Sequence, residues 1–346
     1  MLKLSYILLF VLIIFGCTEE KKDSFSTIEV QVTNRQLLDS LIIYDKEKSW
    51  EIKSTLRFKE SNTALDTLHI MENKLYQIYS FIDGTQGELG EFIMSPNSKI
   101  LLSMNENAPF DSSNYTGSFE LPNNFLAYSK KYQNKLSEMV RKGISQEELE
   151  ILIQDNGNSI NEKGMALGIV DTLQAYVKEK FDQFSGVLKK KNTKYLYKAS
   201  LVNTLGNGFS FKDINNKNIS LTDFKGKYIY IDVWATWCKP CKVEHEFLKE
   251  LEEYFSENDA LQIISVSIDR EYDKWKKYIT SKSMEGIQLH SGSDSEFVKF
   301  YDIGALPRFL FLDTKGNIIS PDEIRPSNPK TLKKLEATLN GMLAKK

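Results

Sequence analysis

Apolar and polar residues alternate in short runs between residues 27 and 122, and this two-residue period is typical of half-buried β-strands. Glycine, proline, asparagine and aspartate separate the runs, as expected for turns. The strands predicted from the pattern are Thr27–Val32, Leu38–Tyr44, Glu51–Phe58, Leu75–Ile82, Phe92–Met94 and Ile100–Met104. Several short strands predict a small β-rich domain over 27–122, built as a sandwich or a curled sheet.

One of these runs makes a specific prediction about side chains. Strict alternation in Glu51–Phe58 should place four residues on one face of the strand: Ile52, Ser54, Leu56 and Phe58. His69 and Trp50 also lie in this domain, but no second catalytic residue type accompanies them in the sequence. We therefore interpret both as packing or surface residues.

The period of the apolar residues changes to a helical one after Pro122, which predicts a helical segment over 123–200. A first apolar stripe runs from Phe125 to Met139, and a second occupies much of the stretch between Met165 and Leu188. Two serines stand three residues before a glutamate, the pattern of a helix-starting capping box: Ser145 and Ser159. Lysines 189–191 are expected close to a helix C-terminus, where the helix dipole favours positive charge.

Strand and helix patterns alternate over 201–346. A hairpin-like stretch at 209–221 is followed by apolar strands at Tyr228–Trp234, Leu261–Ile268 and Phe309–Leu312. Helices are predicted from about residue 241 to 255, at 272–282, briefly near 296–301, and from about residue 330 to 343. This order predicts an α/β domain with mixed strand pairing.

The first residues of the chain read as a targeting segment. Met1–Phe15 carries one lysine, Lys3, ahead of an apolar run that is short for a membrane span. The ending Ile14-Phe15-Gly16-Cys17 resembles a bacterial lipobox, which implies a signal peptide over 1–16, lipid on Cys17 and a polar tether over 17–26. An uncleaved anchor and an ordinary secretory signal are the alternatives. Thr18 after the lipid-bearing cysteine favours the outer membrane.

Composition removes several classes of function. The 45 Lys+Arg against 47 Asp+Glu leave a net charge of −2, which argues against a nucleic-acid partner. The three histidines are widely separated, and three cysteines are too few for a disulfide-dense scaffold. With Cys17 assigned to lipid, Cys238 and Cys241 form a C-x-x-C pair that is either redox-active or half of a metal site. Without a second such pair, structural zinc is not expected, and no cofactor is predicted.

The Cys238–Cys241 pair follows an apolar strand and opens a predicted helix. Backbone N–H groups and the positive end of the helix dipole stabilise a thiolate at the first turn, which lowers the pKa of Cys238 and makes it the attacking nucleophile. Cys241, one turn further on, can then resolve a mixed disulfide. Pro240 is tolerated at this turn and stiffens it. A static structural disulfide is the alternative. Asp232 lies within the preceding apolar strand, where burial should raise its pKa.

The motif Trp237-Cys238-Lys239-Pro240-Cys241 resembles the active site of the thioredoxin superfamily, in the TlpA-like branch of extracytoplasmic thiol-disulfide oxidoreductases. The resemblance extends over roughly residues 205–346. Its other features are Asp232 six residues before Cys238, Glu244 three after Cys241, the triplet Ala305-Leu306-Pro307 and the triplet Arg325-Pro326-Ser327. The region upstream is only weakly similar to the β-rich accessory segments found ahead of such domains.

The resemblance implies roles for individual residues. Asp232 would move protons to and from Cys241, and Glu244 would be a second proton relay or a substrate contact. Pro307 would be a cis-proline beside the cysteines, with substrate bound over a surface made by Trp237, Lys239, Pro240, Leu306 and Pro307. Trp234 should also pack around the site. The substrates would be extracytoplasmic protein disulfides, with apocytochromes or damaged disulfides as candidate classes.

The sequence departs from the family pattern at two positions. Glu246 stands where many relatives have a proline, and no lysine in 263–269 matches the one that thioredoxins place near the buried aspartate. A peroxidase is disfavoured because Ala235, not threonine, lies three residues before Cys238.

Three hypotheses follow for the function. The first is a lipid-anchored envelope reductant in the periplasm, fed by a membrane thiol donor. The second is an oxidase or isomerase, favoured by Lys239, whose charge stabilises a thiolate and hence the dithiol form. The third is a binding or scaffold lipoprotein in which the upstream region holds the function.

Overall fold

The computed structural model describes residues 24–343 except 48–50, 59, 83–84 and 294. The predicted signal peptide, Cys17 and Trp50 lie outside the described residues. The chain divides into two compact units, Met1–Asn192 and Thr193–Lys346, which are considered one at a time. Within the described ranges, no helix is both long and apolar enough to cross a bilayer.

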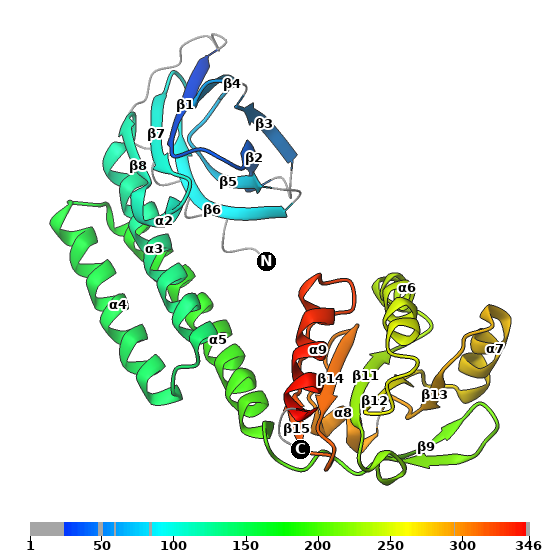
Figure 1. The fold of residues 1–346 in the computed structure, drawn as a ribbon. Coiled ribbons are helices and arrows are strands. Elements are labelled where there is room, and N and C mark those ends of the chain that lie inside the picture. Colours follow the sequence, from blue (N-terminus) through cyan, green and yellow to red (C-terminus); the bar gives the residue numbers. More distant parts are fainter. Residues whose placement is uncertain (1–23, 48–50, 59, 83–84, 294, 344–346) are drawn as a thin grey trace. The chain divides into compact units, whose positions relative to one another are not determined.

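The first unit contains two four-stranded sheets (Figure 1). One has the order β4-β1-β7-β8, formed by Thr63–His69, Phe25–Thr33, Lys99–Asn105 and Asn114–Gly117. The other has the order β3-β2-β5-β6, formed by Glu51–Arg57, Leu38–Asp45, Lys74–Ile82 and Thr85–Met94. Buried residues from both sheets, such as Val30 and Ile43, belong to one apolar core. All six predicted strands are present, whereas β4 and β8 were not predicted.

The expectation that four side chains of the stretch 51–58 share one face is wrong for Ile52. Ser54, Leu56 and Phe58 are buried, but Ile52 is 56% exposed. The register between β2 and β3 shifts by one residue at Ile43, so that Lys53 has no partner in the ladder. A β-bulge of this kind interrupts the alternation of side chains, and no local apolar pattern reveals it.

The rest of the first unit is helical: α2 (Pro109–Ser112), α3 (Glu120–Lys142), α4 (Gln146–Ala166) and α5 (Asp171–Leu201). Ser145 caps α4 as predicted, because its Oγ accepts a hydrogen bond from Glu148 N at 3.1 Å. The helix start predicted at Ser159 is wrong, since this residue lies inside α4 and its Oγ donates to Asp155 O.

The prediction that α5 ends near lysines 189–191 is also wrong, because the helix continues to Leu201. Leu188 and Asn192 are buried one turn apart, and Asn192 donates to Ile144 O. The packed face of the helix therefore extends past the lysines. The division between the two units falls inside this helix.

The second unit is built on a seven-stranded sheet with the order β10-β9-β13-β12-β11-β14-β15 (Figure 1). These strands are Asn218–Ser220, Ser210–Asp213, Ile287–His290, Leu261–Ser267, Tyr228–Trp234, Arg308–Leu312 and Ile318–Ser320. β11 pairs in parallel with β12 and antiparallel with β14, which confirms the predicted mixed pairing. The short strands β13 and β15 were not predicted.

Four α-helices accompany this sheet: α6 (Lys239–Tyr254), α7 (Tyr272–Lys282), α8 (Glu296–Phe300) and α9 (Lys330–Leu343); a 3₁₀ turn, η2, spans Leu221–Phe224. β11 is buried on both faces. Ile229, Ile231 and Val233 belong to the core that contains residues of α7 and α8, whereas Tyr230 packs in the core that contains residues of α6 and α9. Alternation along the strand therefore directs Asp232 to the α6 face.

Candidate functional site

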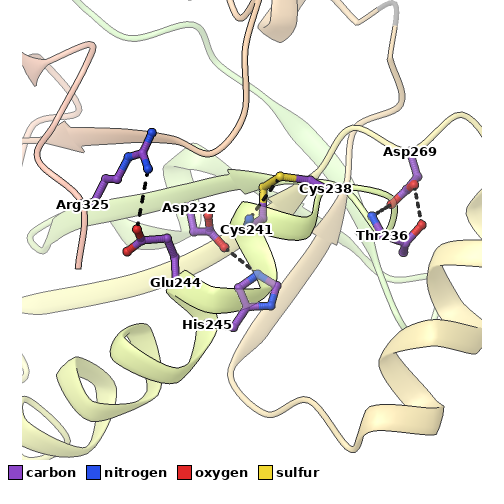
Figure 2. The surroundings of a disulfide bond; sticks show 8 residues. All are labelled: Asp232, Thr236, Cys238, Cys241, Glu244, His245, Asp269 and Arg325. Carbon is purple, nitrogen blue, oxygen red and sulfur yellow. Dashed lines mark hydrogen bonds and ion pairs between the residues drawn. A yellow bond between two sulfur atoms is a disulfide. The ribbon is translucent and has the colours of Figure 1, made fainter. Parts of the chain in front are cut away.

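The two cysteines lie where the interior strand β11 passes into helix α6. Cys238 is the N-cap of α6 and Cys241 lies in its first turn; a disulfide joins them with an S–S distance of 2.03 Å (Figure 2). Cys241 N donates a hydrogen bond to Cys238 Sγ at 3.1 Å. A helix N–H thus already points at the sulfur that would carry negative charge in the dithiol form, which favours its thiolate.

Burial separates the roles of the two sulfurs. Cys241 is completely buried, while Cys238 retains 4% exposure next to Trp237, which is 67% exposed. Cys238 is therefore the sulfur that an incoming partner can reach. Cys241 has no such exposure, and the order of attack predicted from the motif stays a prediction.

Asp269, which the sequence did not indicate, holds the loop that precedes Cys238. Its carboxylate accepts hydrogen bonds from Thr236 N at 2.9 Å and from Thr236 Oγ1 at 2.8 Å (Figure 2). It also accepts one from Ser267 Oγ at 2.7 Å. Asp269 comes two residues after the end of the parallel neighbour strand β12, so its position beyond the carboxyl end of that strand is the signal that could have found it.

Asp232 is fully buried on β11. Its Oδ2 accepts a hydrogen bond from Ser265 Oγ at 3.4 Å and lies 3.2 Å from His245 Nε2. Burial raises the pKa of Asp232, as predicted, while the contacts with His245 and Ser265 act in the opposite direction. Within the described part of the chain, Asp232 Oδ1 has no hydrogen-bond partner.

His245 is the second residue of the site that sequence reasoning missed. It comes four residues after Cys241 on α6, so both side chains lie on the same face of the helix. Its ring packs edge-on against Trp234 at a centroid distance of 4.6 Å, and Figure 2 shows it turned toward Asp232. The spacing from Cys241 was the available signal.

Glu244 is almost completely buried, so it is not a solvated acid on a helix face. Its carboxylate accepts hydrogen bonds from Ser327 N at 3.0 Å and Ser327 Oγ at 2.9 Å, and Arg325 Nη1 lies 3.9 Å away. The triplet that begins at Arg325 is thereby attached to α6. Glu244 anchors this loop, and its function in proton transfer or substrate contact stays a prediction.

The residues predicted to form the substrate surface differ in their exposure. Trp237, Lys239 and Pro240 are exposed, Leu306 is half-buried and Pro307 is buried. The Leu306–Pro307 peptide bond is cis, as the resemblance implied. Of the two tryptophans expected to pack around the site, Trp234 is buried and Trp237 points outward. The described residues contain no cluster of three or more histidine, cysteine or acidic side chains suited to a metal.

Part of the chain is similar to known proteins. The Redoxin family model matches residues 203–339. The thiol-disulfide oxidoreductase ResA of Bacillus thuringiensis is 30% identical over 112 residues, which are 32% of this chain and 63% of the relative. ResA of Oceanobacillus iheyensis is 29% identical over 129 residues, 37% of this chain and 64% of the relative. The aligned part of the chain thus spans somewhat less than two thirds of these curated relatives.

Among solved structures, a thiol-disulfide oxidoreductase from Bacteroides vulgatus shares 48% sequence identity and has a TM-score of 0.37, covering 40% of this chain and 90% of that chain. The family match, the strand order and the C-x-x-C disulfide at the start of α6 together define the C-terminal unit as a thioredoxin-like domain. Such a site can hold two electrons in its dithiol form and give them up when the disulfide forms.

Proposed function

We propose that this protein is a thiol-disulfide oxidoreductase of the cell envelope that reduces disulfides in extracytoplasmic proteins. The observation that carries the proposal is the Cys238–Cys241 disulfide at the N-terminus of α6, with the helix N–H of Cys241 directed at Cys238 Sγ. The buried carboxylate of Asp232 on the neighbouring strand supports it, because thiol exchange requires a group that moves protons.

The reaction begins with the dithiol form. The Cys238 thiolate attacks one sulfur of the substrate disulfide, forms a mixed disulfide and expels the other substrate sulfur as a thiolate. Cys241 then loses its proton and attacks Cys238 Sγ, which breaks the mixed disulfide and releases the second substrate thiolate. The substrate has gained two electrons and leaves as two thiolates, which take up protons from the solvent, and the protein is left as the disulfide seen in the structure.

Replacing Cys238 with serine should abolish disulfide reduction by the full-length protein, measured on a protein disulfide substrate with dithiothreitol as donor. Cys241→Ser, reduced and freed of dithiothreitol before it meets the substrate, should instead arrest the reaction as a mixed disulfide, because the resolving thiol is missing. The mixed disulfide can be detected as a dithiothreitol-sensitive rise in mass. A C238S protein that still reduces the substrate at the wild-type rate would contradict the proposal.

The location is a separate part of the proposal. The N-terminal pattern predicts lipid on Cys17, attachment to the outer membrane and a thioredoxin-like domain in the periplasm, where a membrane thiol donor would supply electrons. Cys17→Ser should move the protein from the membrane fraction to the soluble fraction, or leave the precursor uncleaved, with the disulfide chemistry unchanged. Lys22→Ala in the polar tether, outside the signal peptide, is the matched control. Unchanged fractionation and mass in the C17S variant would contradict lipidation.

A further inference from the structure

The contact between Asp232 and His245 joins two titratable side chains beside the buried cysteine. His245 Nε2 lies 3.2 Å from Asp232 Oδ2, with the histidine 15% exposed and the aspartate at 0%. Asp232 comes from the centre of the sheet and His245 from α6, one helical turn beyond Cys241. His245 therefore lies on the same face of α6 as Cys241, and it is the member of the pair that is partly exposed to solvent.

Burial creates a difficulty for Asp232 as a base. A carboxyl group in an apolar interior favours its neutral form, so its pKa rises, and a protonated acid cannot accept the proton of Cys241. An N–H donor at one oxygen stabilises the ionised form and opposes this effect. His245 Nε2 stands 3.2 Å from Oδ2, close enough to stabilise a charged carboxylate there, although the pair does not have hydrogen-bond geometry in this disulfide form. Asp232 Oδ1 has no partner within the described ranges and is left to accept a proton.

We propose that His245 is a positioning residue that keeps Asp232 ionised, so that Asp232 can take up the proton of Cys241 in the resolving step. This inference rests on the proposed function. In that step the Cys241 S–H bond breaks, its proton moves to Asp232 Oδ1, and the thiolate attacks Cys238 Sγ. No electron passes through the pair, and the same proton returns to Cys241 when a donor reduces the disulfide.

Other groups act on the pair and must be considered in its titration. Glu244 on α6 and Tyr230 on β11 lie close enough for their charges to interact with Asp232, and Glu252 interacts with both Asp232 and His245. From β12, the neutral hydroxyl of Ser265 faces the same carboxylate. Among these, His245 is the cationic or N–H-donating member, so its removal has a defined sign: Asp232 should hold its proton to higher pH.

The test follows the protonation of Asp232 in the detergent-solubilised full-length protein. The C=O stretch of the neutral acid is recorded by infrared spectroscopy against pH and assigned through Asp232→Asn. His245→Phe should raise the pH midpoint of this band by about one to two units, the size expected for losing a hydrogen bond to a charged group. The pH midpoint for resolution of a preformed mixed disulfide should rise with it.

Two further variants separate the effect of the N–H donor from the effect of side-chain packing. His245→Gln keeps an N–H donor and should restore most of the wild-type midpoint. His290→Gln removes the other histidine of this unit, whose Nε2 lies 2.8 Å from Asp269 O, and should leave the Asp232 midpoint unchanged. If H245F does not fold, His245→Met also lacks the donor and gives the same comparison.

The outcomes distinguish this inference from the proposed function. An Asp232 midpoint in the donor-free variant equal to that of wild type, or a shift in H245Q as large as in H245F, would overturn the role of His245. In that case a wild-type protein that reduces disulfides and an inactive C238S variant would leave the proposed function standing. Retained activity in C238S would remove both.

Discussion

At the scale of single residues, buried acids set the chemistry of the second unit. Asp232 was predicted from its place in an apolar strand, and its complete burial agrees with that prediction. Glu244 was predicted as well, but its hydrogen bonds to Ser327 come from a loop more than eighty residues away. Asp269 and His245 were missed. Asp269 contacts Thr236, and His245 contacts Asp232. Each contact joins residues of different elements, so no local sequence pattern encodes it.

Glu252 provides a residue-scale prediction about pH and stability. Burial, followed by the charge of Asp232, raises its pKa from the ordinary 4.5 to about 7. Between these values the folded state binds more protons than the unfolded state, so the free energy of unfolding falls as pH rises through this window. The free energy of unfolding should fall less between pH 5 and pH 8 in Glu252→Gln than in wild type. The expected difference is about 1 kcal/mol, after allowance for the partial exposure of Glu252.

The measurement is urea unfolding of the oxidised protein at both pH values, followed by tryptophan fluorescence. Three of the four tryptophans lie in the second unit, so the signal reports mainly on it. Glu253→Gln, on the exposed side of α6, is the matched control and should behave like wild type. An equal pH dependence in wild type and E252Q would show that Glu252 does not carry this linkage.

At the scale of elements, the residues of the candidate site come together at the junction between β11 and α6. β11 ends at Trp234 and α6 begins at Lys239, so the strand delivers Asp232 and the helix delivers Cys241, His245 and Glu244. The predicted strand matches the observed one, and the predicted helix differs by a residue or two at its ends. Accuracy is high here because β11 is a long apolar run and the Cys-Lys-Pro-Cys segment marks a helix start unambiguously.

Elements were predicted wrongly where the sequence pattern is local but the structure depends on contacts with other elements. Ser159 has a capping-box pattern and yet lies within α4, because buried Ile160 and Gly164 continue the packed face of that helix. The strand β4 was missed because only Ala64 and Leu68 of its seven residues are buried; it forms through pairing with β1 along its whole length. Tertiary pairing and packing outweigh local preference in both cases.

At the scale of the whole molecule, the open question of direction becomes a measurable potential. Lys239 and the N–H of Cys241 stabilise the Cys238 thiolate and favour the dithiol form, which shifts the protein toward an oxidant. Negative charge on Asp232 and Glu244 has the opposite effect. We expect the negative charges to dominate, so that the protein is a reductant. The equilibrium potential of Cys238–Cys241 should then lie nearer to the thioredoxin value of about −270 mV than to the DsbA value of about −120 mV.

A redox titration of the full-length protein against glutathione or dithiothreitol measures this potential. Lys239→Glu should lower it, because the thiolate loses a neighbouring cation, while Lys242→Glu on the next turn serves as a control for net charge. A wild-type value near about −120 mV would support the oxidase or isomerase alternative instead. Absence of a reversible two-electron transition would return attention to the first unit and the scaffold hypothesis.

The sequence alone determined the α/β character of residues 201–346, the order of its main elements and the identity of the cysteine pair, because these depend on apolar periodicity and on residues adjacent in the chain. It also indicated the β-rich and helical regions upstream. Only the tertiary structure decided which side chains surround the disulfide. Asp269, His245 and Ser327 reach the site from separate positions through strand pairing and helix packing, and burial then sets the proton affinity of Asp232.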